Sequence, residues 1–84
     1  MGPAPVGGKP LRAGPFLFEV HKTKFFADNT TEDQLHGHEG FWKVNRGRLQ
    51  LGWFAYRSGS ILYRVADAEE QEAYDKYVLE LIVT

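Results

Sequence analysis

Alternation of apolar and polar positions begins after Pro15 and is typical of a strand with one buried face. Phe16, Phe18 and Val20 occupy one side of the alternation, and the weaker pattern of HKTKFF continues it. This pattern predicts a first strand over residues 16 to 26.

The middle of the chain is punctuated by turn residues. Asp28-Asn29 is a turn signal, and the pair Thr31 and Gln34 resembles a capping box that opens a short helical turn ending at Gly37. Strands are expected over residues 41 to 44, 48 to 56 and 60 to 66, separated by turns at residues 45 to 47 and 58 to 59. Gly52 within the middle strand would permit a bulge or a close backbone approach.

The last segment has the pattern of a helix. Asp67 is placed as an N-cap with Glu70 three positions later, and acidic residues fill the first turn, where the helix dipole favours them. Apolar residues then recur in pairs at four-residue steps, forming one stripe. The stripe consists of Ala73, Tyr74, Tyr77, Val78, Leu81 and Ile82. A fifth strand over residues 77 to 83, after a shorter helix, is the alternative.

These elements predict an α+β fold in which a small antiparallel sheet of about four strands carries the C-terminal helix on one face. The sheet combines a meander over residues 41 to 66 with the strand over residues 16 to 26. Residues 14 to 84 are expected to form a single domain. Residues 1 to 13 are rich in proline and glycine and are expected to be disordered.

The hairpin around Ser58-Gly59 permits two registers. A two-residue loop places Phe54, Ile61, Tyr63 and Val65 on one face, with Trp53 on the other. A three-residue loop, with Gly59 left-handed, places Trp53 with Ile61 instead. Both registers put Arg64 on a face with Leu62 and a large aromatic ring, and the choice decides whether Trp53 or Phe54 is exposed.

Length and composition favour self-association. A domain of 84 residues buries about 60% of the surface that its unfolded chain exposes, so its stability needs support. The sequence contains no cysteine, which excludes disulfides and thiolate zinc sites and leaves oligomerisation as the leading source of that support. Without a long apolar span or a signal-peptide core, the chain is expected to be cytoplasmic.

Residues 41 to 66 contain both tryptophans, six of the twelve aromatic residues and five of the ten basic residues. Aromatic faces interleaved with cationic heads favour a binding surface. The predicted surface consists of Trp42, Lys43, Arg46, Arg48, Trp53, Tyr56, Arg57, Leu62 and Arg64. Residues 1 to 66 carry nine basic and five acidic residues, whereas residues 67 to 84 carry one and six. This split argues against strong nonspecific attraction to nucleic acid by the whole molecule.

Signals for catalysis are weak. His36 and His38, separated by Gly37 and followed by Glu39, are candidate ligands for zinc, nickel or copper, although two nearby glycines suggest a flexible loop. No nucleophile elbow or phosphate-binding loop is present. We therefore expect neither a cofactor nor an enzymatic activity.

The sequence thus predicts a small non-enzymatic binding or adaptor domain, without a membrane partner, that acts as a homodimer. The self-association surface is expected on the helix, at Tyr74, Tyr77, Val78, Leu81 and Ile82. Binding of another protein is compatible with this prediction. A nucleic-acid-binding hairpin over residues 42 to 64 is the first alternative, and a metal-dependent enzyme at His36 and His38 is the second.

Overall fold

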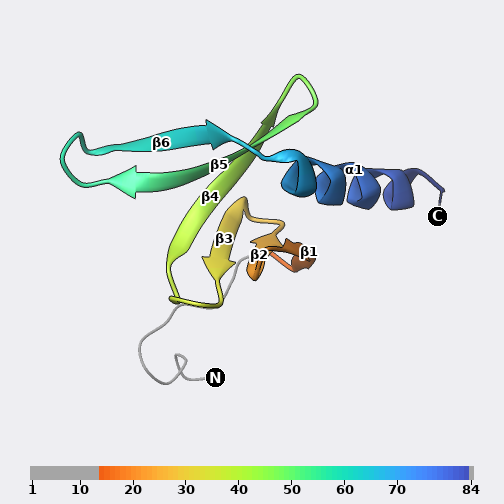
Figure 1. Cartoon of the computed structure of the whole chain (residues 1–84), viewed down its shortest axis with the longest axis horizontal. Coiled ribbons are helices and arrows are strands. Elements are labelled where there is room, and N and C mark those ends of the chain that lie inside the picture. Colours follow the sequence, from red (N-terminus) through yellow and green to blue (C-terminus); the bar gives the residue numbers. More distant parts are fainter. Residues whose placement is uncertain (1–13, 84) are drawn as a thin grey trace.

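The chain folds into a six-stranded antiparallel meander followed by one helix, as shown by a computed structural model that describes residues 14–83 (Figure 1). The predicted α+β class is therefore confirmed. The elements are β1 (Phe16–Val20), β2 (Thr23–Phe26), β3 (Thr30–Asp33), β4 (Glu39–Asn45), β5 (Arg48–Ala55), β6 (Ser60–Val65) and α1 (Ala68–Val83). The disorder expected for residues 1 to 13 lies outside the described residues.

The first predicted strand is a hairpin instead of a single strand. Val20 pairs with Thr23, which leaves His21 and Lys22 as a two-residue loop. Both loop residues have positive φ, at 54° and 61°, as a type I′ turn requires. The prediction was wrong because His-Lys lacks the glycine or asparagine that normally marks such a turn.

The helical turn predicted after Thr31 is also wrong, because this segment forms β3. Thr31 pairs with Phe25 on one side and with Gly40 on the other, so both neighbouring strands supply backbone partners. Pairing on both sides outweighs the local capping signal of Thr31 and Gln34. The strand at residues 30–33 and the division of the first strand raise the expected four strands to six.

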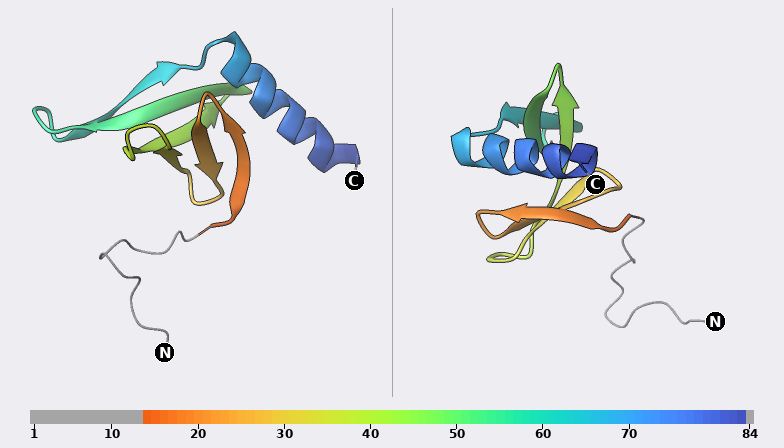
Figure 2. Two further views of the ribbon diagram at one scale, coloured as in Figure 1. Left: turned by 60° about the horizontal axis from the view of Figure 1, so that its bottom comes forward. Right: turned by 90° about the vertical axis from the view of Figure 1, so that its right-hand side faces the viewer.

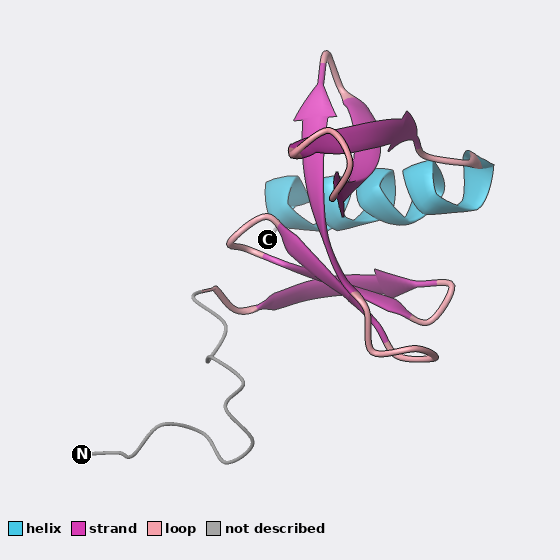
Figure 3. Ribbon diagram, turned by 90° about the vertical axis from the view of Figure 1, so that its left-hand side faces the viewer, coloured by secondary structure: helices cyan, strands magenta, loops and turns pink. Residues whose placement is uncertain are grey.

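The sheet bends, and α1 lies inside the bend. The helix contacts β1 and β5, which are far apart in the strand order. Figures 2 and 3 show the helix between the strands of the first half of the sheet and those of the second half. The sheet edges β1 and β6 are not paired with each other, so the sheet stays open.

An aromatic cluster around Phe18 fills the space between the bent sheet and the helix. The Phe18 ring stacks on Phe25 at 4.5 Å and on Tyr77 at 5.4 Å between centroids. Trp42 and Tyr74 complete the cluster at 6.5 and 6.2 Å from the same ring. Such offset and edge contacts stabilise a core beyond the area they bury.

The core of the described chain is nevertheless small. Its buried apolar side chains are Phe25, Phe26 and Leu49. A domain of this size has little interior, so most of its large apolar residues remain partly accessible.

The C-terminal helix is confirmed and extends to Val83, which excludes the alternative fifth strand. Its start is a capping box, as the spacing of Asp67 and Glu70 predicts. The Glu70 amide donates to Asp67 Oδ1, and the Asp67 amide donates to Glu70 Oε1, both at 2.8 Å. In residues 14–83, no helix combines the length and apolarity needed to cross a membrane.

The β5–β6 hairpin has neither of the two loops considered from the sequence. Phe54 pairs with Ile61 and Trp53 with Leu62, so residues 56 to 59 form a four-residue loop. Gly59 is left-handed, with φ of 68°, as the three-residue geometry required. The distribution of side chains between the two faces matches the two-residue geometry. Phe54 shares one face with Ile61, and Trp53 shares the other with Leu62. Arg64 shares a face with Leu62 and a large aromatic ring, as both registers predicted, and that ring is Trp53, as in the two-residue geometry.

Candidate functional site

The outer half of the β5–β6 hairpin carries exposed apolar side chains on both faces. This half extends away from the helix (Figure 1). Trp53 and Leu62 form a cross-strand pair on one face, and each is 45% exposed. Phe54 and Ile61 form the next pair on the other face and are also exposed. Two-sided exposure of this kind is typical of a surface that another macromolecule covers.

Tyr56 extends this surface into the loop. Its side chain is 89% exposed, and its ring lies edge-on to Phe54 with centroids 5.0 Å apart. We define the hairpin tip as the exposed apolar residues Trp53, Phe54, Tyr56, Ile61 and Leu62. Phe54 and Ile61 were not among the predicted binding residues, because the hairpin register decides their exposure.

The end of α1 is a second exposed apolar region. We define the helix end as Leu79, Leu81, Ile82 and Val83, which are 59 to 74% exposed. Of the predicted self-association residues, Leu81 and Ile82 belong to this region. Tyr74, Tyr77 and Val78 are half-buried, and both tyrosines contact Phe18 within the same chain.

The polar or cationic groups of three predicted binding residues are engaged within the chain. The indole of Trp42 belongs to the Phe18 cluster and donates to the Phe26 carbonyl at 2.8 Å. Lys43 lies over the ring of Tyr63, with Nζ 4.1 Å from the centroid. Arg64 is held by Glu70 through two hydrogen bonds of 2.8 Å. The indole, ammonium and guanidinium groups of these residues are therefore less available to a ligand than the sequence indicates.

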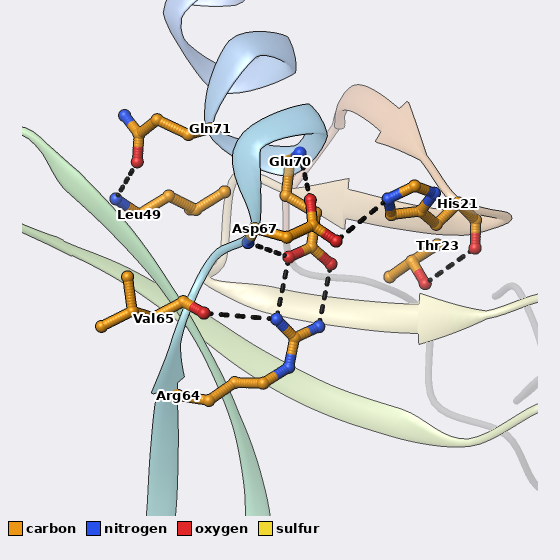
Figure 4. Close-up of polar contacts among 8 residues, drawn as sticks. All are labelled: His21, Thr23, Leu49, Arg64, Val65, Asp67, Glu70 and Gln71. Atoms are coloured by element: carbon orange, nitrogen blue, oxygen red, sulfur yellow. Dashed lines mark hydrogen bonds and ion pairs between the residues drawn. The ribbon is translucent and has the colours of Figure 1, made fainter.

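Arg64 belongs to a polar network that joins strand β6, the start of α1 and the β1–β2 turn (Figure 4). Glu70 connects β6 to the capping box of α1, and Asp67 continues to His21 through a contact of 3.2 Å between Oδ2 and Nε2. The hydrogen bond from Arg64 lowers the pKa of Glu70 although burial opposes it. The Glu70 amide is the main cause of the lowered pKa of Asp67. This network fixes the start of α1 against the sheet.

The remaining basic residues of the predicted binding surface are divided between the two ends of β5. Arg46 and Arg48 lie at its first end, whereas Arg57 lies in the loop beyond its last residue. Arg48 borders a groove of about 480 Å³ whose other charged side chains are acidic, namely Asp67, Glu72 and Asp75. The basic residues thus do not form one continuous cationic surface along the hairpin.

A second groove, of about 450 Å³, lies between β1 and α1. Leu17, Phe18, Ala73 and Tyr77 contribute apolar surface. Its charged lining consists of Glu19, Glu69, Glu72, Lys76 and Glu80. Neither groove is lined by a histidine.

The histidines are divided between two places. His21 contacts Asp67 beside the start of the helix. His36 and His38 lie together in the turn between β3 and β4, with stacked rings whose centroids are 5.5 Å apart. Asp33 is added to this pair by the structure and was not among the predicted ligands.

Comparisons of the chain with protein-family models, with curated proteins and with solved structures found no significant match. The function of the chain is therefore inferred from its residues and their geometry.

Proposed function

We propose that this chain is a small non-catalytic protein-binding domain that acts as a homodimer. In the dimer, the hairpin tip of each copy packs on the helix end of the other. The observation that carries the proposal is the gathering of exposed large apolar residues into these two regions, which lie on either side of a domain with a small core. Mutual burial would supply apolar contact that a single copy lacks.

The arrangement of the two regions favours contact between two copies over contact within one copy. The hairpin tip and the helix end extend in opposite directions from the sheet (Figures 1 and 2). A two-fold axis would place each hairpin beside the partner's helix and create two identical contacts.

Charge supports a second copy as the occupant. Residues 52 to 66 contain two arginines and no acidic residue. Helix α1 contains five acidic residues and one lysine. The two elements therefore carry opposite net charge, which favours hairpin-to-helix contact and disfavours helix-to-helix contact.

The alternatives proposed from the sequence receive less support from the geometry. A nucleic-acid surface would need phosphate-binding side chains in one row, whereas Arg48 borders acidic residues and Arg64 is paired with Glu70. A catalytic site would need a cleft beside its reactive groups, and neither groove adjoins His36 or His38. A cytoplasmic setting, with which the cysteine-free sequence is compatible, completes the proposal.

Analytical ultracentrifugation over a concentration series tests the dimer. The wild-type chain should sediment as a dimer at high concentration, and Phe54→Glu and Ile82→Glu should each sediment as a monomer. Both side chains are exposed, so neither substitution removes a core contact. Leu35→Glu is the matched control, because Leu35 is also exposed but lies between β3 and β4.

Mixing the two variants tests the pairing itself. A Phe54→Glu copy retains its helix end and an Ile82→Glu copy retains its hairpin tip, so an equimolar mixture restores one of the two contacts. Dimer should reappear in the mixture although each variant alone is monomeric. A wild-type chain that remains monomeric at all concentrations would refute the homodimer, and a mixture that stays monomeric would refute hairpin-to-helix pairing.

A further inference from the structure

The turn between β3 and β4 brings three metal-ligand side chains together. Among residues 14–83, Asp33, His36 and His38 form a group in which each offers one ligand atom, all within 4.8 Å of one another. Asp33 Oδ2 and His36 Nδ1 are 3.0 Å apart. Ligand atoms around a tetrahedral zinc ion are about 3.3 Å apart, given bond lengths of about 2.0 Å. Small rotations of the three side chains would therefore complete the geometry.

The backbone of this turn is held by hydrogen bonds that need no metal. The Gly37 amide donates to the Asp33 carbonyl at 2.7 Å, and the Asp33 amide donates to the His38 carbonyl at 2.8 Å. The Leu35 amide donates to Asp33 Oδ1, which fixes the carboxylate. Gly37 has φ of 70°, a conformation that glycine adopts without steric cost. The turn is therefore formed without a metal, despite its glycines. Binding an ion then costs less conformational entropy than ordering a flexible loop would.

The donor set selects the class of ion. Two imidazoles and one carboxylate suit zinc and its first-row neighbours better than magnesium or calcium, which prefer oxygen ligands. Three protein ligands leave at least one coordination position open. Glu32 and Glu39 pair across the strands next to the turn and add negative charge nearby.

A second group, His21, Asp67 and Glu70, has similar spacing but a different environment. Both oxygens of Glu70 accept hydrogen bonds from Arg64, and Oε1 also accepts from the Asp67 amide. A metal there would have to displace a guanidinium and a helix cap. In the β3–β4 turn, by contrast, the contacts of the Asp33 carboxylate are with His36 and the Leu35 amide.

We propose that Asp33, His36 and His38 form a binding site for one divalent transition-metal ion of the zinc class. The site is separate from the hairpin tip and the helix end, and it does not depend on the proposed homodimer.

Calorimetric titration with zinc chloride tests the site, using protein that carries no histidine tag and has been freed of metal with a chelator. One ion should bind per chain. His38→Ala should weaken binding at least tenfold. Asp33→Asn should do the same, because it keeps an oxygen acceptor for the Leu35 amide but removes the anionic ligand. His21→Ala is the matched control and should bind like the wild type.

Imidazole ¹H–¹⁵N spectra of the wild-type chain give a second readout that involves no substitution. Zinc should shift the ring signals of His36 and His38 and leave those of His21 in place. The absence of saturable binding, equal affinity in His38→Ala and the wild type, or a shift confined to His21 would each overturn the proposal.

Discussion

Arg64 and Glu70 form a bidentate ion pair that joins strand β6 to the first turn of helix α1, with both nitrogen-to-oxygen distances at 2.8 Å. The Glu70 side chain is almost fully buried, whereas that of Arg64 is about half exposed. Glu70 also closes the capping box with Asp67. One carboxylate therefore both attaches the helix to strand β6 and caps the first turn of the helix.

Glu70→Ala should lower the free energy of unfolding by about 1–3 kcal/mol, because it removes charge-assisted hydrogen bonds and half of the helix cap. Urea denaturation followed by circular dichroism measures the change. Glu72→Ala, at an exposed position of the same helix, is the control and should change stability by less than about 0.5 kcal/mol. Equal effects of the two substitutions would show that the ion pair contributes nothing specific.

The stability of the fold should depend on acid pH through the same carboxylate. Folding lowers the pKa of Glu70 from its ordinary value of 4.5, chiefly because Arg64 hydrogen-bonds the charged form. A group with a lowered folded-state pKa stabilises the fold above its unfolded-state pKa, and that contribution is lost as pH falls through the folded-state pKa. The melting temperature should therefore decrease below about pH 4.5, and it should decrease less steeply in Glu70→Gln. A Glu70→Gln profile parallel to that of the wild type would contradict this assignment.

The two tryptophans should respond differently to the same substitution. Trp42→Phe removes the hydrogen bond to the Phe26 carbonyl and ring atoms from the Phe18 cluster, and it should cost about 1–3 kcal/mol. Trp53→Phe removes atoms from an exposed ring and should leave the stability of the monomer almost unchanged. Chemical denaturation at low protein concentration measures both. A larger loss for Trp53→Phe would contradict the assignment of Trp42 to the core.

Gly52 lies beneath the ring of Tyr63, and a side chain at this position should be destabilising. A Cβ atom on Gly52 would lie 2.7 Å from Cε1 of Tyr63, closer than packed atoms approach. Gly52→Ala should therefore cost about 1–3 kcal/mol through displacement of the ring. In a Tyr63→Ala background the same change should cost clearly less, as a double-mutant cycle would measure. An unchanged cost would show that the strain arises elsewhere.

Two turns with positive φ offer a matched pair of substitutions. Lys22 has φ of 61° in the β1–β2 turn, and Gly47 has φ of 80° in the β4–β5 turn. Lys22→Gly should stabilise the fold by about 0.5 kcal/mol, because glycine adopts this conformation without a Cβ clash. Gly47→Ala should destabilise it by about 1–2 kcal/mol for the converse reason. Thermal unfolding measures both, and shifts of the same sign would contradict this account.

The errors made from the sequence share a physical cause. Thr31 and Gln34 have the spacing of a capping box, but Thr31 forms strand β3 because β2 and β4 pair with it on both sides. His21 and Lys22 lack the usual residues of a tight turn, yet Phe18 and Phe25 stack across the two strands that the turn connects. In both places, contacts between segments outweigh the preference of the local residues.

The sequence by itself determined the features that depend on neighbouring residues. These are the strand periodicity, the turn before Arg48, and the helix with its cap at Asp67 and Glu70, because each arises from a repeat or spacing of a few positions. The tertiary structure decided that Trp42 lies in the core while Trp53 is exposed, and that Asp33 joins His36 and His38. The placement of the two tryptophans depends on strand register and on the bend of the sheet, which are settled by packing between distant segments and not by any local pattern. The grouping of Asp33 with the two histidines depends on the turn that closes where β3 and β4 pair.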